Sequence, residues 1–253
     1  MIISPFNPLF FLRDNKRTGD SSPFTQIFSS TDSIFLQVIR TALEEPFICE
    51  VYNAVNGSKV RTIECSQHTV NQTDCVDCYT ITGLECGEYI LCLNDNESEP
   101  FIITDDKFIL DKTVLIQYSP AEISIRKDVA GVIDGKRIFF SFRAPGGFKD
   151  DGWSFSVENE QFTTDMADIM ELYGMESTQK TLTIGFSHGV PIWYGQLLNR
   201  LLTCRYVYID NIRFARFESS VPEKEQTIQG VNSFVFTQKL QEIRYNEPKL
   251  EII

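Results

Sequence analysis

A succession of short apolar segments, separated by residues that favour turns, constrains the fold of this chain more than any other feature. The clearest pair, residues 50–55 and 58–63, flanks Asn56-Gly57, a dipeptide that accepts positive φ in the tight turn of a β-hairpin. The first half contains further segments of this kind at 24–29, 34–40, 78–83, 88–93, 100–104 and 113–118. About eight short strands with intervening turn signals are typical of a β-sandwich, which we predict for residues 1–122.

The second half of the chain, residues 123–253, combines strands with helical patterns. A hairpin is expected around Asp134-Gly135, and Asp210-Asn211 is a candidate turn. Further strands are predicted at 180–186, 205–217 and 233–240. Together with two helices, these strands indicate a smaller α+β domain that ends in a strand or arm. The sequence therefore predicts a mainly β fold, an N-terminal β-sandwich followed by this α+β domain.

The two helices are predicted from capping residues and from apolar periodicity. Thr163-Thr164-Asp165 can cap a helix that runs to Tyr173, with Gly174 as its terminator. A second helix is expected after Pro191, because proline is favoured in the first turn. Apolar residues recur on one face of this second helix: Tyr194, Leu197, Leu198, Leu201 and Leu202. This stripe either packs on the domain's own sheet or docks a partner, and we expect it to pack on the sheet.

Charge separates the two halves and argues against nucleic acid as a partner. The chain has 23 basic and 35 acidic residues, a net charge of −12, whereas nucleic-acid-binding domains present a basic surface. Residues 1–120 carry a net charge of −9 and residues 121–253 a net charge of −3. Like copies pack more easily through a nearly neutral surface, so we expect the second half to hold most subunit contacts. The acidic half is expected to face solvent or a basic partner.

Several features predict a protein that is made and folded in a cytoplasm. No apolar run approaches the roughly 18 residues that cross a bilayer, so no membrane partner is expected. Residues 1–12 are apolar, but two prolines interrupt them and no basic residue precedes them, unlike a signal peptide. The seven cysteines are an odd number and cannot all pair within one chain. They are expected to be reduced thiols that behave as small apolar residues.

Two segments raise the question of metal binding. Cys75-Val76-Asp77-Cys78 has the two-residue spacer with which two thiolates can reach one zinc ion, but a second such pair is missing. Asn94-Asp95-Asn96-Glu97 could offer oxygens to calcium, although the spacing of an EF-hand is absent. We predict no metal and no cofactor, while zinc at Cys75 and Cys78 stays an open alternative.

A literal G-x-S-x-G motif at residues 185–189 is the strongest hint of catalysis. A nucleophilic Ser187 would need a histidine to accept its proton, and in α/β-hydrolases that histidine comes later in the chain. No histidine follows the motif; the chain has only His68 and His188, and His188 is adjacent to Ser187. We therefore predict no catalytic residues and interpret the two glycines as turn residues, with a hydrolase that uses Ser187 as a third hypothesis.

Acidic pairs and a glycine-rich segment are further candidates for chemistry. Asp105-Asp106, Asp150-Asp151 and Glu158 with Glu160 could act on a glycosidic bond only if two carboxylates faced each other across a cleft. Solvated turns are the expected places for them. Residues 144–148 lack the Lys-Ser/Thr that follows a phosphate-binding loop, so we predict a sharp turn there.

Seven segments spread along the chain are similar to segments of one group of proteins. They are residues 4–11, 19–26, 113–118, 142–148, 158–162, 189–193 and 233–238. Through this series the chain resembles, over nearly its whole length, uncharacterised proteins of the tail-gene clusters of phages and prophages of Bacteroides-type bacteria. The resemblance implies a tail or tail-tip component of the virion, assembled in the host cytoplasm. It supplies no catalytic residues.

The first functional hypothesis is accordingly a non-enzymatic structural subunit of a phage tail or baseplate. Such a ring, hub or fibre-attachment component would act in a symmetric oligomer and contact other tail proteins, including a receptor-binding fibre. Residues 218–226, 1–12 and 250–253 are candidate arms for these contacts, and 218–226 could equally be a plain surface loop. The alternative hypothesis is a carbohydrate- or cell-surface-binding β-sandwich protein that uses Trp153 or Trp193 as an aromatic platform.

Overall fold

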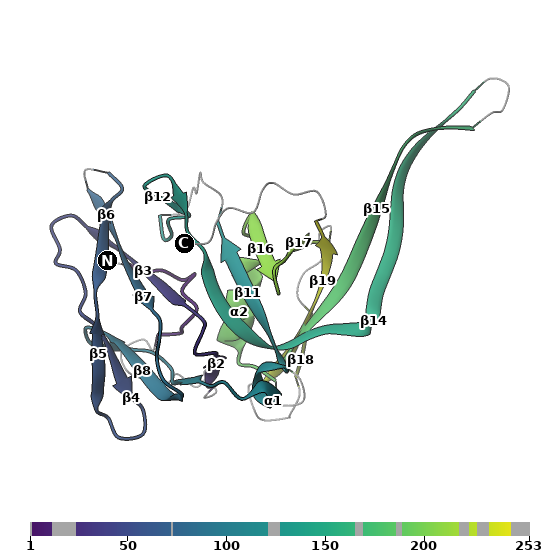
Figure 1. Cartoon of the computed structure of the whole chain (residues 1–253). Coiled ribbons are helices and arrows are strands. Elements are labelled where there is room, and N and C mark those ends of the chain that lie inside the picture. Colours follow the sequence, from purple (N-terminus) through teal and green to yellow (C-terminus); the bar gives the residue numbers. More distant parts are fainter. Residues whose placement is uncertain are drawn as a thin grey trace.

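The structure is a computed structural model that describes most of the chain. The described residues are 2–11, 24–71, 73–120, 127–164, 169–185, 189–217, 223–226 and 233–243. Within them the protein is mainly β, with three larger sheets, one two-stranded sheet and two helices, α1 (Lys107–Leu110) and α2 (Ile192–Leu201). Figure 1 shows a sandwich, a barrel beside it and a long hairpin that projects from the barrel.

Two sheets form the sandwich in the first half of the chain, as predicted. One has the order β1 (Ile2–Ile3), β3 (Ile34–Thr41), β7 (Asp74–Ile81) and β6 (Cys65–Thr69). The other has the order β2 (Gln26–Phe28), β10 (Phe101–Ile103), β8 (Gly87–Leu93), β4 (Cys49–Asn53) and β5 (Lys59–Ile63), with β9 (Asn96–Glu97) paired to β8. Successive residues of a strand point to opposite faces, so one face of each sheet supplies buried side chains to a shared core.

The predicted hairpins form, with turns that differ in detail. β4 and β5 pair as expected, but residues 54–58 connect them, and at the predicted Asn56-Gly57 turn only Gly57 has a positive φ. Asp134 and Gly135, with φ of 51° and 76°, join β12 (Val132–Ile133) to β13 (Lys136–Arg137). Two positive φ values define the type I′ turn, whose twist matches that of the flanking strands.

Strands of the second half close into an antiparallel barrel. Its ring order is β11 (Thr113–Ser119), β14 (Phe140–Thr163), β15 (Ile169–Ile184), β19 (Phe234–Glu242), β17 (Ile212–Arg216) and β16 (Tyr206–Ile209), which pairs with β11 again. Closure pairs the ladder groups of the strands around the ring and leaves no sheet edge in it. β11 precedes residue 122 yet lies in this sheet, and the domain division at residue 122 stays a prediction.

One of the expected arms is a strand of the same sheet. Residues 223–226 form β18 (Glu223–Gln226), which pairs with β19 beside β17. The rest of the predicted 218–226 segment, and the C-terminal residues 250–253, lie outside the described residues.

Helix α2 packs against the barrel through the stripe predicted from the sequence. All five stripe residues are buried: Tyr194, Leu197, Leu198, Leu201 and Leu202. The Tyr194 ring meets the Phe142 ring of β14 edge-on, with centroids 5.5 Å apart. Gly195 permits the close approach, because a Cβ atom there would overlap the Phe236 ring of β19. The stripe is therefore part of the protein's own core and is not a docking surface.

The N-terminal segment joins the sandwich to the barrel. Phe6 is buried, and its carbonyl accepts a hydrogen bond from the Tyr118 hydroxyl of β11. The Phe10 ring stacks on Trp193 of α2 at a centroid distance of 4.6 Å. One hydrophobic core thus continues from the sandwich into the barrel. Residues 2–11, expected to contact another subunit, are tied down within their own chain.

The helix predicted between Asp165 and Tyr173 is wrong. Residues 169–173 belong to β15, and residues 165–168 lie outside the described residues. Gly174, the predicted terminator, lies within β15 opposite Asn159 of β14. Cross-strand pairing satisfies the backbone here and overrides the local capping signal. The described part of the second half consequently has one helix instead of two.

The sharp turn predicted at residues 144–148 is also wrong, because this segment continues β14 without a reversal. Gly146 has a φ of 140°, and a Cβ atom there would overlap the backbone oxygen of Thr183 on β15. Glycine at this position allows β14 and β15 to approach each other closely.

Candidate functional site

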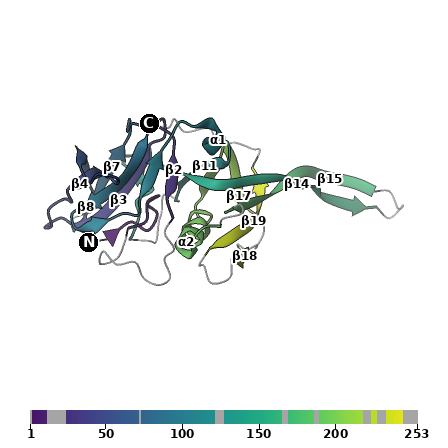
Figure 2. The same ribbon diagram turned by 90° about the horizontal axis from the view of Figure 1, so that it is seen from below.

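A two-stranded hairpin extends from the barrel and dominates the outline of the molecule. This arm consists of residues 153–163 of β14 and 169–180 of β15, which pair antiparallel along its length. β19 accompanies β15 only between Gln179 and Ile184, so no other described strand pairs with the arm beyond Gln179. Figures 1 and 2 both show the arm pointing away from the sandwich and the barrel.

An apolar stripe runs along one face of the arm. Trp153, Phe155 and Val157 alternate along β14, and their relative exposures are 47%, 73% and 65%. Alternate residues of a strand share one face, so the three side chains form a continuous arm stripe. Contiguous apolar surface of this kind on a soluble protein marks a site of interaction.

The opposite face of the arm is polar. Ser154 and Ser156 of β14 lie across from Gln179 and Ser177 of β15. The hydroxyl groups of Ser156 and Ser177 are 2.7 Å apart, and the Gln179 amide donates to Ser156 Oγ at 3.4 Å. The arm is therefore amphipathic, as in a sheet that has one covered and one solvated face.

The arm stripe continues the inner face of the barrel. Ile184, Leu182 and Lys180 alternate along β15 and are buried, and Trp153 lies directly opposite Lys180. The Lys180 ammonium lies 4.2 Å from the centroid of the Trp153 ring and 3.0 Å from Oε2 of Glu242. This face of β15 is covered by the core inside the barrel and stays buried at Lys180 and Thr178. On the arm, the same face of the hairpin is exposed at the three stripe residues of β14.

Charge distinguishes the arm from the barrel that carries it. Residues 149–180 contain eight acidic and two basic residues, a net charge of −6, whereas the rest of residues 121–253 has a net charge of +3. The acidic candidates Asp150-Asp151, Glu158 and Glu160 all lie in β14 and not in the turns expected for them. The nearly neutral second half thus combines an acidic segment, which contains the arm, with a basic remainder; the arm itself has four acidic residues and one basic residue.

Arginines gather on the outer face of the barrel. The guanidinium carbons of Arg137, Arg205 and Arg213 lie 4.1, 5.5 and 4.8 Å from the ring centroid of Tyr206 on β16. Tyr206 is on the face opposite the core residue Val207, but only 5% of it is exposed. Arg205 is exposed, and Arg137 and Arg213 are half-buried. We call these four residues, Arg137, Arg205, Tyr206 and Arg213, the arginine patch. Arg is enriched in the energetically dominant parts of protein interfaces.

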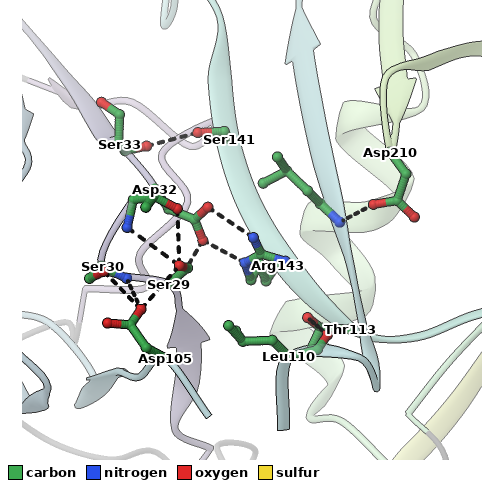
Figure 3. A network of polar contacts seen from close by, with 12 residues as sticks. Ser29, Ser30, Asp32, Ser33, Asp105, Leu110, Thr113, Ser141, Arg143 and Asp210 are labelled. Atoms are coloured by element: carbon green, nitrogen blue, oxygen red, sulfur yellow. Dashed lines mark hydrogen bonds and ion pairs between the residues drawn. The ribbon is translucent and has the colours of Figure 1, made fainter. Parts of the chain in front are cut away.

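An ion pair fixes β14, the strand that becomes the arm, to the sandwich (Figure 3). Arg143 donates from Nε to Asp32 Oδ2 at 2.6 Å and from Nη2 to Oδ1 at 3.1 Å. The Ser29 backbone N–H donates to the same carboxylate at 2.8 Å, and Ser141 Oγ donates to the Ser33 carbonyl at 2.8 Å. A bidentate pair sets orientation as well as distance, so the base of the arm is held in one direction.

The two carboxylates of the Asp105-Asp106 pair have different partners. Asp105 accepts hydrogen bonds from Ser30, at 2.7 Å from Oγ and 3.2 Å from the backbone N–H (Figure 3). These bonds favour the charged form and hold the pKa of Asp105 below its ordinary value. Asp106 caps α1 by accepting from the Phe108 backbone N–H at 2.9 Å. Both residues therefore serve loop and helix structure.

The two glycines of the G-x-S-x-G motif lie between β15 and α2. Gly185 and Gly189 have φ of 116° and 69°, and the Gly189 N–H donates to the Gly185 carbonyl at 2.6 Å. Ser187 and His188 lie outside the described residues. The other histidine, His68 of β6, lies with Nδ1 2.8 Å from Oδ2 of Asp134 in the β12–β13 turn.

Cys75 and Cys78 lie three positions apart on β7 and so point to opposite faces of the strand. Cys78 is buried, and desolvation raises the pKa of its thiol to about 12. In the described part of the chain, no three His, Cys, Asp or Glu residues are gathered as a metal ion would require. Residues 94–97, the calcium candidate, contain the turn between β8 and β9, where Asn94 Oδ1 accepts from the Ile48 N–H at 2.8 Å.

The two tryptophans of the platform hypothesis lie in different environments. Trp193 is only 6% exposed and packs against Phe10 and Phe24. Its role as a surface platform is therefore excluded by burial, and Trp153 on the arm is the one that solvent reaches.

Comparison of the chain with protein-family models, with curated proteins and with solved structures finds no match. No helix among the described residues is long and apolar enough to cross a membrane.

The arm and the arginine patch are the two surfaces that sequence reasoning missed. A signal for the arm is present in Trp153-Ser154-Phe155-Ser156-Val157, whose strict alternation has the period of an amphipathic strand. No comparable signal marks the patch, because Arg137 is far in sequence from Arg205 and Arg213.

Proposed function

We propose that this chain is a non-enzymatic structural subunit of a phage tail or baseplate and that it works within a symmetric oligomer. In this role it connects neighbouring tail proteins and receptor-binding fibres, as a ring, hub or fibre-attachment component of the virion. The resemblance of seven segments to tail-cluster proteins supports this assignment.

The arm is the observation that carries the proposal. An isolated two-stranded hairpin is marginal in water, and this one exposes Trp153, Phe155 and Val157 on a single face. Such a hairpin suits a protein that works with its arm against a neighbouring subunit, where the stripe is covered. The Asp32–Arg143 ion pair directs the arm from a fixed body, as a building block of defined geometry requires.

Mass spectrometry of purified virions tests the proposal. We expect peptides of this chain in intact particles at a copy number set by the symmetry of the tail, and a cryo-electron microscopy map should place them there. Absence of the polypeptide from intact particles would overturn the assignment.

A second candidate function, binding of carbohydrate or a cell surface, is favoured by one observation, the exposed Trp153 ring beside Phe155. Flat aromatic rings are the expected platforms for sugars. Glycan-array binding by the full chain that Trp153→Ala abolishes would favour this candidate, and binding that survives the substitution would count against it.

A further inference from the structure

We infer that the arm binds a second copy of this chain, seating its acidic, apolar-striped hairpin on the arginine patch of the neighbour. The inference rests on the proposed function only in naming the partner of the arm. Its own grounds are the arm stripe, the opposite charges of arm and barrel, and the direction in which the arm points.

The exposed apolar side chains of the arm stripe need a partner that buries them. The stripe is the outward continuation of the barrel's inner face past Lys180, so its residue types are those of a core. Eleven strand residues at about 3.4 Å each give the arm a reach of roughly 35 Å, enough to cross a neighbouring barrel. Truncating an aromatic side chain at the centre of such an interface typically weakens binding at least about tenfold.

The second ground is charge complementarity. The segment that contains the arm has a net charge of −6, and the rest of the second half has a net charge of +3. On that basic body the arginine patch concentrates three guanidinium groups within 5.5 Å of one tyrosine ring. Two arms would repel each other, so arm-to-body contact is favoured over arm-to-arm contact.

The direction in which the arm points also favours binding to a second copy. In both views the arm points away from the body of its own chain (Figures 1 and 2), so the arm and the arginine patch meet only between copies. A contact between two different surfaces of identical chains is heterologous. It closes into a ring when the rotation between copies closes, which is the geometry of a symmetric tail component.

Sedimentation velocity of the full chain across a wide range of concentrations tests the inference. We expect wild-type protein to rise above the monomer mass of 29.0 kDa, and the variant Trp153→Ser/Phe155→Ser/Val157→Ser to remain at that mass. The matched control Ser154→Ala/Ser156→Ala changes the polar face of the same strand and should associate like wild type. The Trp153 ring also lies 4.2 Å from the buried Lys180 ammonium, so Phe155→Ser/Val157→Ser, which keeps Trp153, is the second variant: it should weaken association as well and keep the wild-type Tm.

Charge-reversal variants test whether the arm binds at the arginine patch of the neighbouring copy. Arg205→Glu/Arg213→Glu should weaken association at least about tenfold, and adding Glu176→Lys, which lies opposite Val157 on the stripe face of the arm, should restore part of it. Association that is unaffected by the arginine reversal would overturn the assignment of the patch. The wild-type contact should also weaken as salt is raised, because salt screens exposed charges.

The Trp153 ring provides an independent readout. Its emission should shift to shorter wavelength as the chain associates, and Trp153→Phe should abolish that shift because Trp193 is already buried. A wild-type chain that stays monomeric at every concentration overturns the inference, even if virions contain the protein. A chain that self-associates through the arm yet is absent from virions overturns the proposed function and leaves this inference standing.

Discussion

At the scale of single residues, the Asp32–Arg143 ion pair shows how burial makes the loss of one partner costly. The side chains of Asp32 and Arg143 are only 6% and 18% exposed. Replacing Arg143 by alanine leaves a buried carboxylate without its bidentate partner, so we expect the free energy of unfolding to fall by about 3–5 kcal/mol. Urea denaturation measures the loss. The double variant Asp32→Ala/Arg143→Ala should lose less than the sum of the single variants, and strictly additive losses would contradict the pairing.

Cysteine reactivity is a second property decided residue by residue. Desolvation raises the pKa of both Cys49 and Cys78 to about 12, whereas Cys86 is exposed. Because the thiolate is the reactive form, iodoacetamide at mildly alkaline pH should modify Cys86 and spare the two buried thiols. Peptide mass spectrometry of native protein checks this, with urea-unfolded protein as the control in which all three react. Equal labelling of Cys49 and Cys86 in the native state would show that Cys49 is not buried.

At the scale of elements, the close packing of α2 against the barrel depends on glycine, which has no side chain, at position 195. Gly195→Ala would place a methyl group in the space of the Phe236 ring, and we expect overpacking to cost about 1–3 kcal/mol. Thermal and urea unfolding measure the effect. Gln196→Ala, an exposed position on the same helix, is the matched control and should change stability by less than about 0.5 kcal/mol. A neutral Gly195→Ala variant would mean that α2 lies farther from β19.

At the scale of the whole molecule, the body and the arm are expected to be separable. Replacing residues 155–178 by Asn-Gly would join Ser154 to Gln179, which face each other across the hairpin, through a two-residue turn. Because β19 and the barrel core remain intact, the shortened chain should unfold cooperatively in urea and change in stability by less than about 1 kcal/mol. Loss of cooperative unfolding would show that the arm is part of the folding unit.

The sequence anticipates elements whose signal is local. The strands of the sandwich, the Asp134-Gly135 hairpin and the buried stripe of α2 follow from alternation, turn residues and helical periodicity. The predicted helix at 165–173 also rested on a local signal, and it is wrong. A capping signal and a terminating glycine are present there, but the pairing of β15 with β14 outweighs them.

By itself, then, the sequence determined the strands of the sandwich, the turn at Asp134-Gly135 and the apolar face of α2, because each depends on residues a few positions apart. Only the tertiary structure decided that β11 closes a barrel with later strands, that β14 and β15 run on together as an arm, and that Arg137 joins Arg205 and Arg213 over Tyr206. Those outcomes depend on which distant strands pair. Strand pairing is chosen by the packing of the whole chain, and a local pattern does not specify it.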